Sequence, residues 1–223
     1  FIPIQQLQDK SFVVKDYQRG YKWGKEQIEA LLKDIDQHKE GKYCLQPVVV
    51  QTQKDGIEVI DGQQRLTSIY LLLYFLEQQK PYTLEYQTRE RTKNFLNNEM
   101  ESLHAFNFNE ESNNWQAFIK HNKTYNNVDV FHLVNVYKHI NAWFNNKEDS
   151  YILEFTEKLR TQVYVIWYNV KENNAITSAE QVFLNLNAGK VPLTNSELIK
   201  ALFVLDAQKN KTKDIGKLKA FEL

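Results

Sequence analysis

The residues best suited to chemistry form one short run, Asp61-Gly62-Gln63-Gln64-Arg65-Leu66-Thr67. A β-branched segment precedes this run and a long apolar segment follows it, so we expect it where a strand ends and a helix begins. In α/β folds, backbone N–H groups and the helix dipole face an incoming anion at such a junction. The run therefore predicts a turn that binds a phosphate group.

A purely structural interpretation of the same run is available. Asp61 is a good N-cap, Gln64 would complete a capping box, and Gly62 would ease a tight turn. With Asp61 as N-cap, however, Arg65 falls at the fourth helical position, where an apolar residue would form a hydrophobic staple. The dipole disfavours a cation in the first turn by about 0.3–1 kcal/mol, and a bound phosphate would reverse that penalty. These two details favour a ligand.

The residue types suggest roles in phosphoryl transfer, which depends on charge neutralisation and a positioned water. We expect Arg65 to contact a phosphate, and Asp61 to hold Mg²⁺ through water or to act as a base. Gln63 and Gln64 would orient the attacking water or recognise the base or ribose. The chain has no Walker A sequence, so an NTPase here would not be of the P-loop kind.

A second polar run combines cations and aromatic rings, Tyr17-Gln18-Arg19-Gly20-Tyr21-Lys22-Trp23. Arg19 is expected as a second cation in the site, with a surface salt bridge as the alternative. Tyr17, Gln18, Tyr21 and Trp23 are candidates for contact with a nucleobase or a flipped DNA base. The alternative for the rings is packing against a neighbouring helix, which is the preferred interpretation for Trp23.

A third run, residues 183–200, contains a polar turn and further charge. Asn187 and Gly189 are expected to bind phosphate in this turn, where Gly189 is also a plausible helix C-cap. Lys200 would add positive charge, although a lysine is more commonly just solvated. Gly62 and Thr67 of the first run are expected at the same phosphate.

Taken in order, the three runs resemble motifs of the N-terminal, ParB/sulfiredoxin-like domain of GmrSD-type restriction proteins. Residues 61–65 match its DGQQR signature, residues 18–23 resemble its early QR-x-Y-x-W motif, and residues 183–200 resemble its late F-x-x-x-N-x-G block with the L-I-K that follows. The resemblance implies an NTP-binding and hydrolysing domain in defence against foreign or modified DNA. It also implies an HNH-type nuclease as a fused or separate partner.

The chain departs from a nuclease in one respect. Its five His residues are dispersed and form no His-Asn-His pattern, so we expect any nuclease domain to lie beyond residue 223. The first residue is Phe, which favours a fragment of a longer protein. Two alternatives to an NTPase are a non-catalytic module that senses modified DNA and a ParB-like nucleotide-gated clamp, which would require a homodimer.

Composition sets the remaining bounds. The formal net charge is zero, which excludes a uniformly basic coat for nucleic acid but not local basic patches. The single cysteine, Cys44, excludes a disulfide framework and a Cys-based zinc site, and it favours a reducing, cytoplasmic setting with this thiol buried. The longest apolar run, Ile69–Leu76, is far below the roughly 20 residues of a membrane span, so no membrane contact is expected.

Periodicity predicts the elements that must position the three runs. Strands are expected at 12–14, 47–50, 57–60, 82–87 and 162–170, and helices at 27–38, 66–77, 128–144 and 151–159. Capping boxes predict two more helices that start at Thr177 and Thr194. A lone strand at 162–170 needs a sheet, and the nearest one lies in the first 90 residues.

The expected fold class is therefore α+β, a small ParB/sulfiredoxin-like mixed sheet with helices, elaborated by a helical segment. We expect one functional unit over 1–223, in which 1–88 together with 162–200 form the nucleotide core and 89–161 form a helical insertion.

Overall fold

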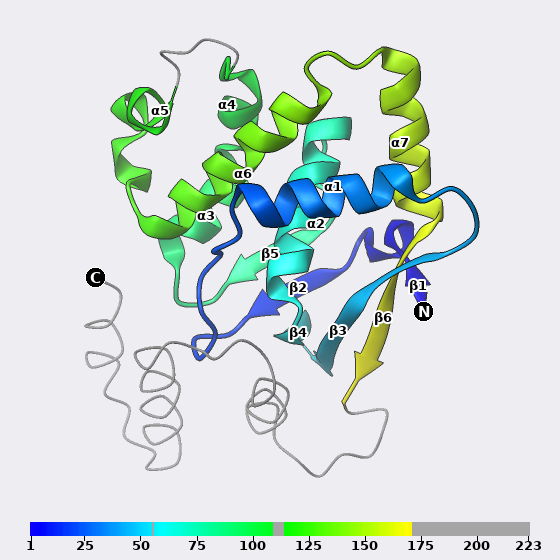
Figure 1. The fold of residues 1–223 in the computed structure, drawn as a ribbon. Coiled ribbons are helices and arrows are strands. Elements are labelled where there is room, and N and C mark those ends of the chain that lie inside the picture. Colours follow the sequence, from blue (N-terminus) through cyan, green and yellow to red (C-terminus); the bar gives the residue numbers. More distant parts are fainter. Residues whose placement is uncertain (55, 109–113, 171–223) are drawn as a thin grey trace.

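The computed structural model describes residues 1–54, 56–108 and 114–170. Within these ranges, a six-stranded mixed sheet carries the helices together on one side (Figure 1). The expectation of a mixed sheet with helices is confirmed. No helix in these ranges is both long and apolar enough to cross a bilayer.

The strands run in the spatial order β1-β6-β3-β4-β2-β5. β2 is parallel to both β4 and β5, and β3 is parallel to β6, whereas β3–β4 and β1–β6 are antiparallel. Their bounds are β1 Ile2–Pro3, β2 Ser11–Val14, β3 Tyr43–Gln53, β4 Gly56–Asp61, β5 Thr83–Tyr86 and β6 Val163–Asn169.

β6 is the strand that returns to the sheet after the helical segment. It lies between β1 and β3, and it aligns Val163 with Tyr43 and Val165 with Leu45. Val163, Val165 and Leu45 are all buried in the core. The segment predicted as a strand at 162–170 thus completes a sheet whose other strands come from the first 90 residues.

The helices divide into those near the start of the chain and those between β5 and β6. Their bounds are α1 Lys25–Gln37, α2 Gln63–Glu77, α3 Glu90–Asn98, α4 Met100–Ala105, α5 Trp115–His121, α6 Val128–Phe144 and α7 Asp149–Thr161, with short 3₁₀ turns η1 Ile4–Leu7 and η2 Lys123–Tyr125. α3, α4 and α5 fall in the region expected to be helical, but their individual bounds were not predicted.

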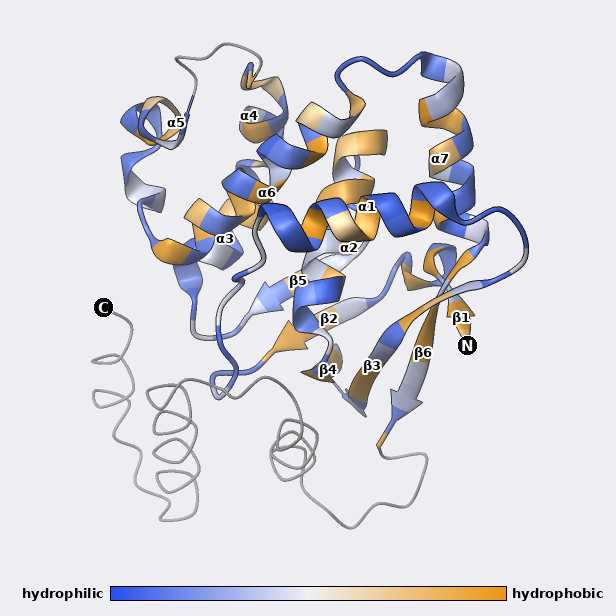
Figure 2. Ribbon diagram, in the orientation of Figure 1, coloured by the Kyte–Doolittle hydropathy of each residue, from blue (hydrophilic) through white to orange (hydrophobic). Residues whose placement is uncertain are grey.

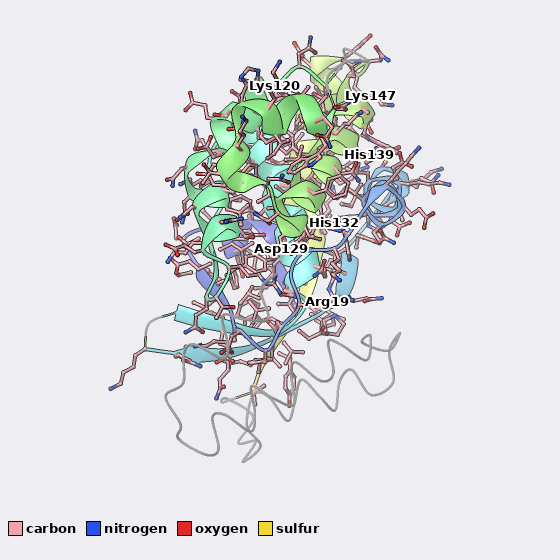
Figure 3. The ribbon with its side chains drawn as sticks, turned by 90° about the vertical axis from the view of Figure 1, so that its left-hand side faces the viewer. Arg19, Lys120, Asp129, His132, His139 and Lys147 are labelled. Atoms are coloured by element: carbon pink, nitrogen blue, oxygen red, sulfur yellow. The ribbon has the colours of Figure 1, made fainter. Side chains whose placement is uncertain are left out.

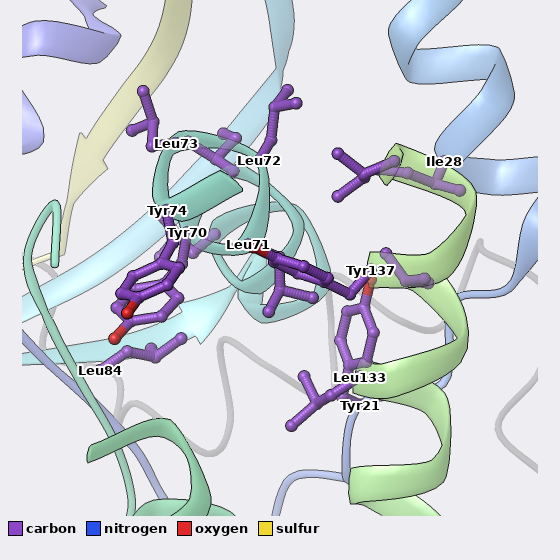
Figure 4. Packing of buried hydrophobic residues seen from close by; sticks show 14 of the residues in the cluster. Tyr21, Ile28, Tyr70, Leu71, Leu72, Leu73, Tyr74, Leu84, Leu133 and Tyr137 are labelled. Atoms are coloured by element: carbon purple, nitrogen blue, oxygen red, sulfur yellow. The ribbon is translucent and has the colours of Figure 1, made fainter. Parts of the chain in front are cut away.

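α2 is the centre of the core. It is apolar around most of its circumference, as Figure 2 shows, and its residues are buried almost continuously from Gln63 to Tyr74. Side chains of α1 and α6, among them Ile28 and Leu133, pack around it (Figure 4). The helix ends where Gln78 adopts a left-handed conformation and its N–H bonds the carbonyl of Tyr74. A helix covered on all sides needs this near-continuous apolar sequence.

The helical segment shares this core. α6 packs against both α1 and α2, and α7 packs against α1, α2 and η1. Phe75 of α2 stacks on Phe144 of α6 with ring centroids 5.5 Å apart, and Arg160 of α7 pairs with Glu77 of α2 at 2.5 Å. The helices between β5 and β6 are therefore built onto the same core as the sheet.

Three details differ from the expectations. α1 runs from Lys25 to Gln37 with His38 as its C-cap rather than over 27–38, and Gly41 lies beyond the helix at φ 82°. Cys44 is exposed rather than buried, because Leu45 beside it faces the core and strand alternation directs Cys44 to the other side. The helices expected to begin at Thr177 and Thr194 lie outside the described residues.

A pair of leucine substitutions tests the central position of α2. Leu72 is fully buried, whereas Leu153 on α7 is 71% exposed. Leu72→Ala is expected to lower the free energy of unfolding by about 2–5 kcal/mol, because it removes packed methyl groups and leaves a cavity. Leu153→Ala should change it by less than about 0.5 kcal/mol. Urea unfolding followed by circular dichroism measures both, and equal effects would contradict this core.

Candidate functional site

The candidate site lies where β4 passes into α2. Asp61 is the last residue of β4, and Gly62 is the N-cap of α2 with φ 98°. A Cβ atom on Gly62 would lie 3.0 Å from Val48 Cγ2, so the close approach of β3 also favours glycine here. The expectation that Asp61 caps the helix is wrong, because the cap falls one residue later and no side chain caps α2.

Segment 17–23 docks on the first turn of α2 through the two glutamines of the first run. Gln64 Nε2 donates to the carbonyl of Gly20 at 2.9 Å, and the backbone N–H of Lys22 donates to Gln64 Oε1 at 2.8 Å. Gln63 Nε2 donates to the carbonyl of Arg19 at 2.6 Å. Gln64 therefore forms no capping box, because both ends of its amide bind the backbone of the docked segment.

Three side chains of segment 17–23 point into the protein. Tyr21 is fully buried and its hydroxyl lies 2.7 Å from Ser68 Oγ, while the Tyr17 hydroxyl donates to Glu58 Oε1 at 2.9 Å. Gln18 Nε2 donates to the carbonyl of Ile60 at 2.7 Å. Tyr21 packs in the core, and Tyr17 and Gln18 are buried against β4, so contact of these three with a DNA base stays a prediction that would require them to move.

The burial of Tyr21 has an electrostatic consequence. Removal from water raises the pKa of its phenol well above the ordinary value, so Tyr21 stays neutral and acts as a hydrogen-bonding anchor at Ser68. Trp23 is half-buried and packs against the core, in agreement with the preferred interpretation of its role.

Arg65 connects α2 to the neighbouring strands. Its Nη1 donates to Gln46 Oε1 at 2.8 Å, and its Nη2 donates to the carbonyl of Pro47 and lies 3.4 Å from Asp61 Oδ2. Burial lowers the pKa of Arg65, and the carboxylate of Asp61 acts in the opposite direction. Arg65 is the third helical residue rather than the fourth. A contact between Arg65 and a phosphate stays a prediction, because the guanidinium is engaged with β3 and Asp61.

Thr67 does not reach the site. It is fully buried, and its hydroxyl donates to the carbonyl of Gln63 at 2.8 Å and lies 2.7 Å from the hydroxyl of Tyr86. The hydroxyl of Thr67 is therefore engaged inside the protein, and its contact with a phosphate stays a prediction. Thr67 anchors the first turn of α2 to β5.

Three buried polar atoms of the two runs have no hydrogen-bond partner among the described residues: Gln18 Oε1, Gln63 Oε1 and Arg65 Nε. An unpaired buried acceptor or donor costs about 1–3 kcal/mol relative to a paired one. Two amide oxygens and one guanidinium N–H at the start of α2 therefore carry unused hydrogen-bonding capacity inside the fold.

Arg19 is the exposed cation of the docked segment. Its backbone carbonyl is held by Gln63, while its side chain is exposed and forms no ion pair within the described ranges. Arg19 is therefore accessible beside the start of α2, and its contact with a ligand stays a prediction.

The remaining predicted residues can be placed briefly. Asn187, Gly189 and Lys200 lie outside the described residues. Asp61 is largely covered, with 17% of its side chain exposed beside Arg65, and within the described ranges no cluster of three or more His, Cys, Asp or Glu side chains is arranged to hold a metal ion. A polar depression elsewhere is lined by none of the motif residues and lies between the end of α1 and α7.

Sequence reasoning missed two residues that border the site. Asp129 of α6 lies against Gly20 and pairs with Arg89 at 2.7 Å. Nothing in the local pattern around Asp129 indicates this role, because its partners come from distant parts of the chain.

The turn at Gly62 can be tested with a second glycine as the control. Gly62 and Gly41 both have positive φ, but a Cβ would be crowded by Val48 only at Gly62 and would meet nothing within 4 Å at Gly41. Gly62→Ala is expected to lower the free energy of unfolding by about 1–3 kcal/mol, and Gly41→Ala by about 1 kcal/mol. Thermal unfolding compares the two, and a larger loss at Gly41 would contradict the close approach of β3.

Comparison with known proteins identifies the family of this chain. A search of curated proteins gave no match. The family model described as the GmrSD restriction endonuclease, N-terminal domain, matches residues 4–204. This match covers most of the chain and includes all the described residues that carry the site. The chain therefore belongs to the family of GmrSD restriction endonuclease N-terminal domains.

Proposed function

We propose that this chain binds a nucleoside triphosphate at the start of α2 and hydrolyses it, as the regulatory domain of a restriction protein. The observation that carries the proposal is the uncapped N-terminus of α2, beside which Arg19 is exposed and the amide oxygens of Gln18 and Gln63 are unpartnered. The first N–H groups of a helix have no partner within the helix, and together with its dipole they favour an anion.

The charge at this place suits a polyphosphate. Arg19 is held beside α2 by the hydrogen bond from Gln63 to its carbonyl, which leaves the guanidinium for phosphate oxygens. Charge-assisted hydrogen bonds from guanidinium to phosphate are among the strongest in proteins. Arg19 is accordingly the principal phosphate contact in this proposal, ahead of Arg65, whose Nη atoms bind Gln46, Pro47 and Asp61.

The unpartnered oxygens suit the other parts of the ligand. An amide oxygen accepts a hydrogen bond, but Gln18 Oε1 and Gln63 Oε1 are buried. Each would take a hydrogen bond from a ribose hydroxyl, a base amino group or the attacking water once its side chain turns toward the ligand. Positioning of that water is the main task of such residues in phosphoryl transfer. Asp61 is the residue that would hold Mg²⁺ through water, and the ion would neutralise charge on the phosphates.

Family membership supports the biological context. The matched family is named for restriction endonucleases, which makes DNA and a nuclease domain of the HNH type the expected partners of this chain. A purely DNA-sensing module was proposed from the aromatic rings of segment 17–23. That alternative loses support, because Tyr17 and Tyr21 are buried.

Phosphate release tests the proposal directly. The chain is incubated with Mg²⁺ and each of ATP, GTP, CTP and UTP, with and without DNA. Hydrolysis of at least one nucleotide is expected, and Arg19→Ala should raise the KM for that nucleotide about tenfold or more, because a charge-assisted phosphate contact is lost.

Arg91→Ala provides the matched control. Arg91 is also an exposed arginine, but it lies on α3. Its substitution should leave both kcat and KM within about twofold of the parent values. If the parent chain neither hydrolyses nor binds any of the nucleotides, the proposed function is overturned. An unchanged KM for Arg19→Ala would remove Arg19 from the site.

A further inference from the structure

The start of α6 carries a buried carboxylate that faces the docked segment. Asp129 is the second residue of α6, and only 8% of its side chain is exposed. Arg89 Nη1 donates to its Oδ2 at 2.7 Å, and Thr92 Oγ1 donates to the same oxygen at 3.4 Å. Figure 3 shows Asp129 and His132 on α6, next to the part of the chain that carries Arg19.

The other carboxylate oxygen occupies the place of a side chain at Gly20. A Cβ atom built on Gly20 would lie 1.9 Å from Asp129 Oδ1 and 2.6 Å from Oδ2, far inside any possible contact. Gly20 is therefore a glycine because the carboxylate packs against its backbone. The same residue offers its carbonyl to Gln64 on the opposite helix.

Segment 17–23 is thus held between two helices. α2 binds its backbone through Gln63 and Gln64, whereas α6 contacts it through Asp129 at Gly20. α6 belongs to the helical segment between β5 and β6, so this segment reaches the candidate site by direct contact.

We propose that Asp129 is a positioning residue: held by Arg89, its carboxylate fixes Gly20 and thereby sets the place of Arg19 at the start of α2. The helical segment would then govern whether the site is competent. This inference rests on the proposed function for its catalytic consequence, but the contact itself can be tested without a nucleotide.

Limited proteolysis tests the contact. Trypsin cleaves after Arg19 and Lys22, which are both exposed, and mass spectrometry identifies the fragments that end there. Asp129→Ala is expected to accelerate cleavage at these two sites about tenfold, because loss of the carboxylate lowers the free energy of local opening. Cleavage after Lys158, the lysine of α7, should be unchanged.

The matched control is Glu77→Ala. Glu77 pairs with Arg160 of α7 much as Asp129 pairs with Arg89, as a carboxylate–guanidinium pair between two parts of the fold, but it lies in the last turn of α2, away from segment 17–23. Both variants lose an ion pair, and only Asp129→Ala should accelerate cleavage after Arg19 and Lys22. Equal acceleration in the two variants, or none in Asp129→Ala, would overturn the proposal.

Two further variants separate shape from general instability. Asp129→Asn keeps the shape against Gly20 and should restore cleavage to within about threefold of the parent. Gly20→Ala should accelerate cleavage by itself, because its Cβ collides with Asp129, and the double variant with Asp129→Ala should be no worse than either single one. Simple addition of the two effects would contradict direct contact.

The nucleotide readout completes the test. For the nucleotide that the parent hydrolyses, Asp129→Ala should raise KM about tenfold with kcat changed less, and Asp129→Asn should recover most of this loss, whereas Glu77→Ala should leave KM unchanged. If the parent chain neither binds nor hydrolyses a nucleotide, the proposed function and the catalytic part of this inference are overturned. The rates of tryptic cleavage would then still test the contact between Asp129 and Gly20.

Discussion

The double hydrogen bond of Gln64 is the interaction on which the candidate site depends. Segment 17–23 has no regular secondary structure, so its backbone groups need partners from elsewhere. Gln64 supplies one donor to Gly20 and one acceptor to Lys22. An ionised carboxylate has no donor and an alkyl side chain has neither group, whereas a primary amide offers both at the required spacing. This interaction brings two runs that are distant in the sequence together as one structure.

That constraint divides the motif residues into two groups. Gln64, Tyr21 and Thr67 direct their polar groups inward and build the turn. Arg19 is exposed and forms no ion pair within the described ranges, while the amide oxygens of Gln18 and Gln63 are buried without a hydrogen-bond partner there. Each inward hydrogen bond contributes about 0.5–1.5 kcal/mol net, so together they fix the backbone that carries Arg19. Pre-organisation of this kind lowers the cost of binding.

The sequence predicted the elements whose signal is local and missed those whose cause is tertiary. α2, α6 and β6 were predicted because long apolar or periodic runs specify them directly. The two-residue strand β1 carries no such signal and exists only through its pairing with β6. Asp61 has the propensity of an N-cap, yet the cap is Gly62, because the approach of Val48 and a positive φ decide the position. The aromatic rings of segment 17–23 suggested ligand contact, and only the three-dimensional core reveals that Tyr21 is enclosed.

The pairing of Asp129 with Arg89 explains how a carboxylate can border the proposed anion site. An unpaired carboxylate next to Gly20 would repel a phosphate and would favour protonation on burial. Arg89 at 2.7 Å neutralises it, so the carboxylate acts on Gly20 through its shape while Arg19 keeps its positive charge for a ligand. Removal of Arg89 would leave a buried charge without compensation, a larger perturbation than removal of the pair. The helical segment therefore contributes both the carboxylate that supports segment 17–23 and the cation that prevents that carboxylate from opposing the ligand.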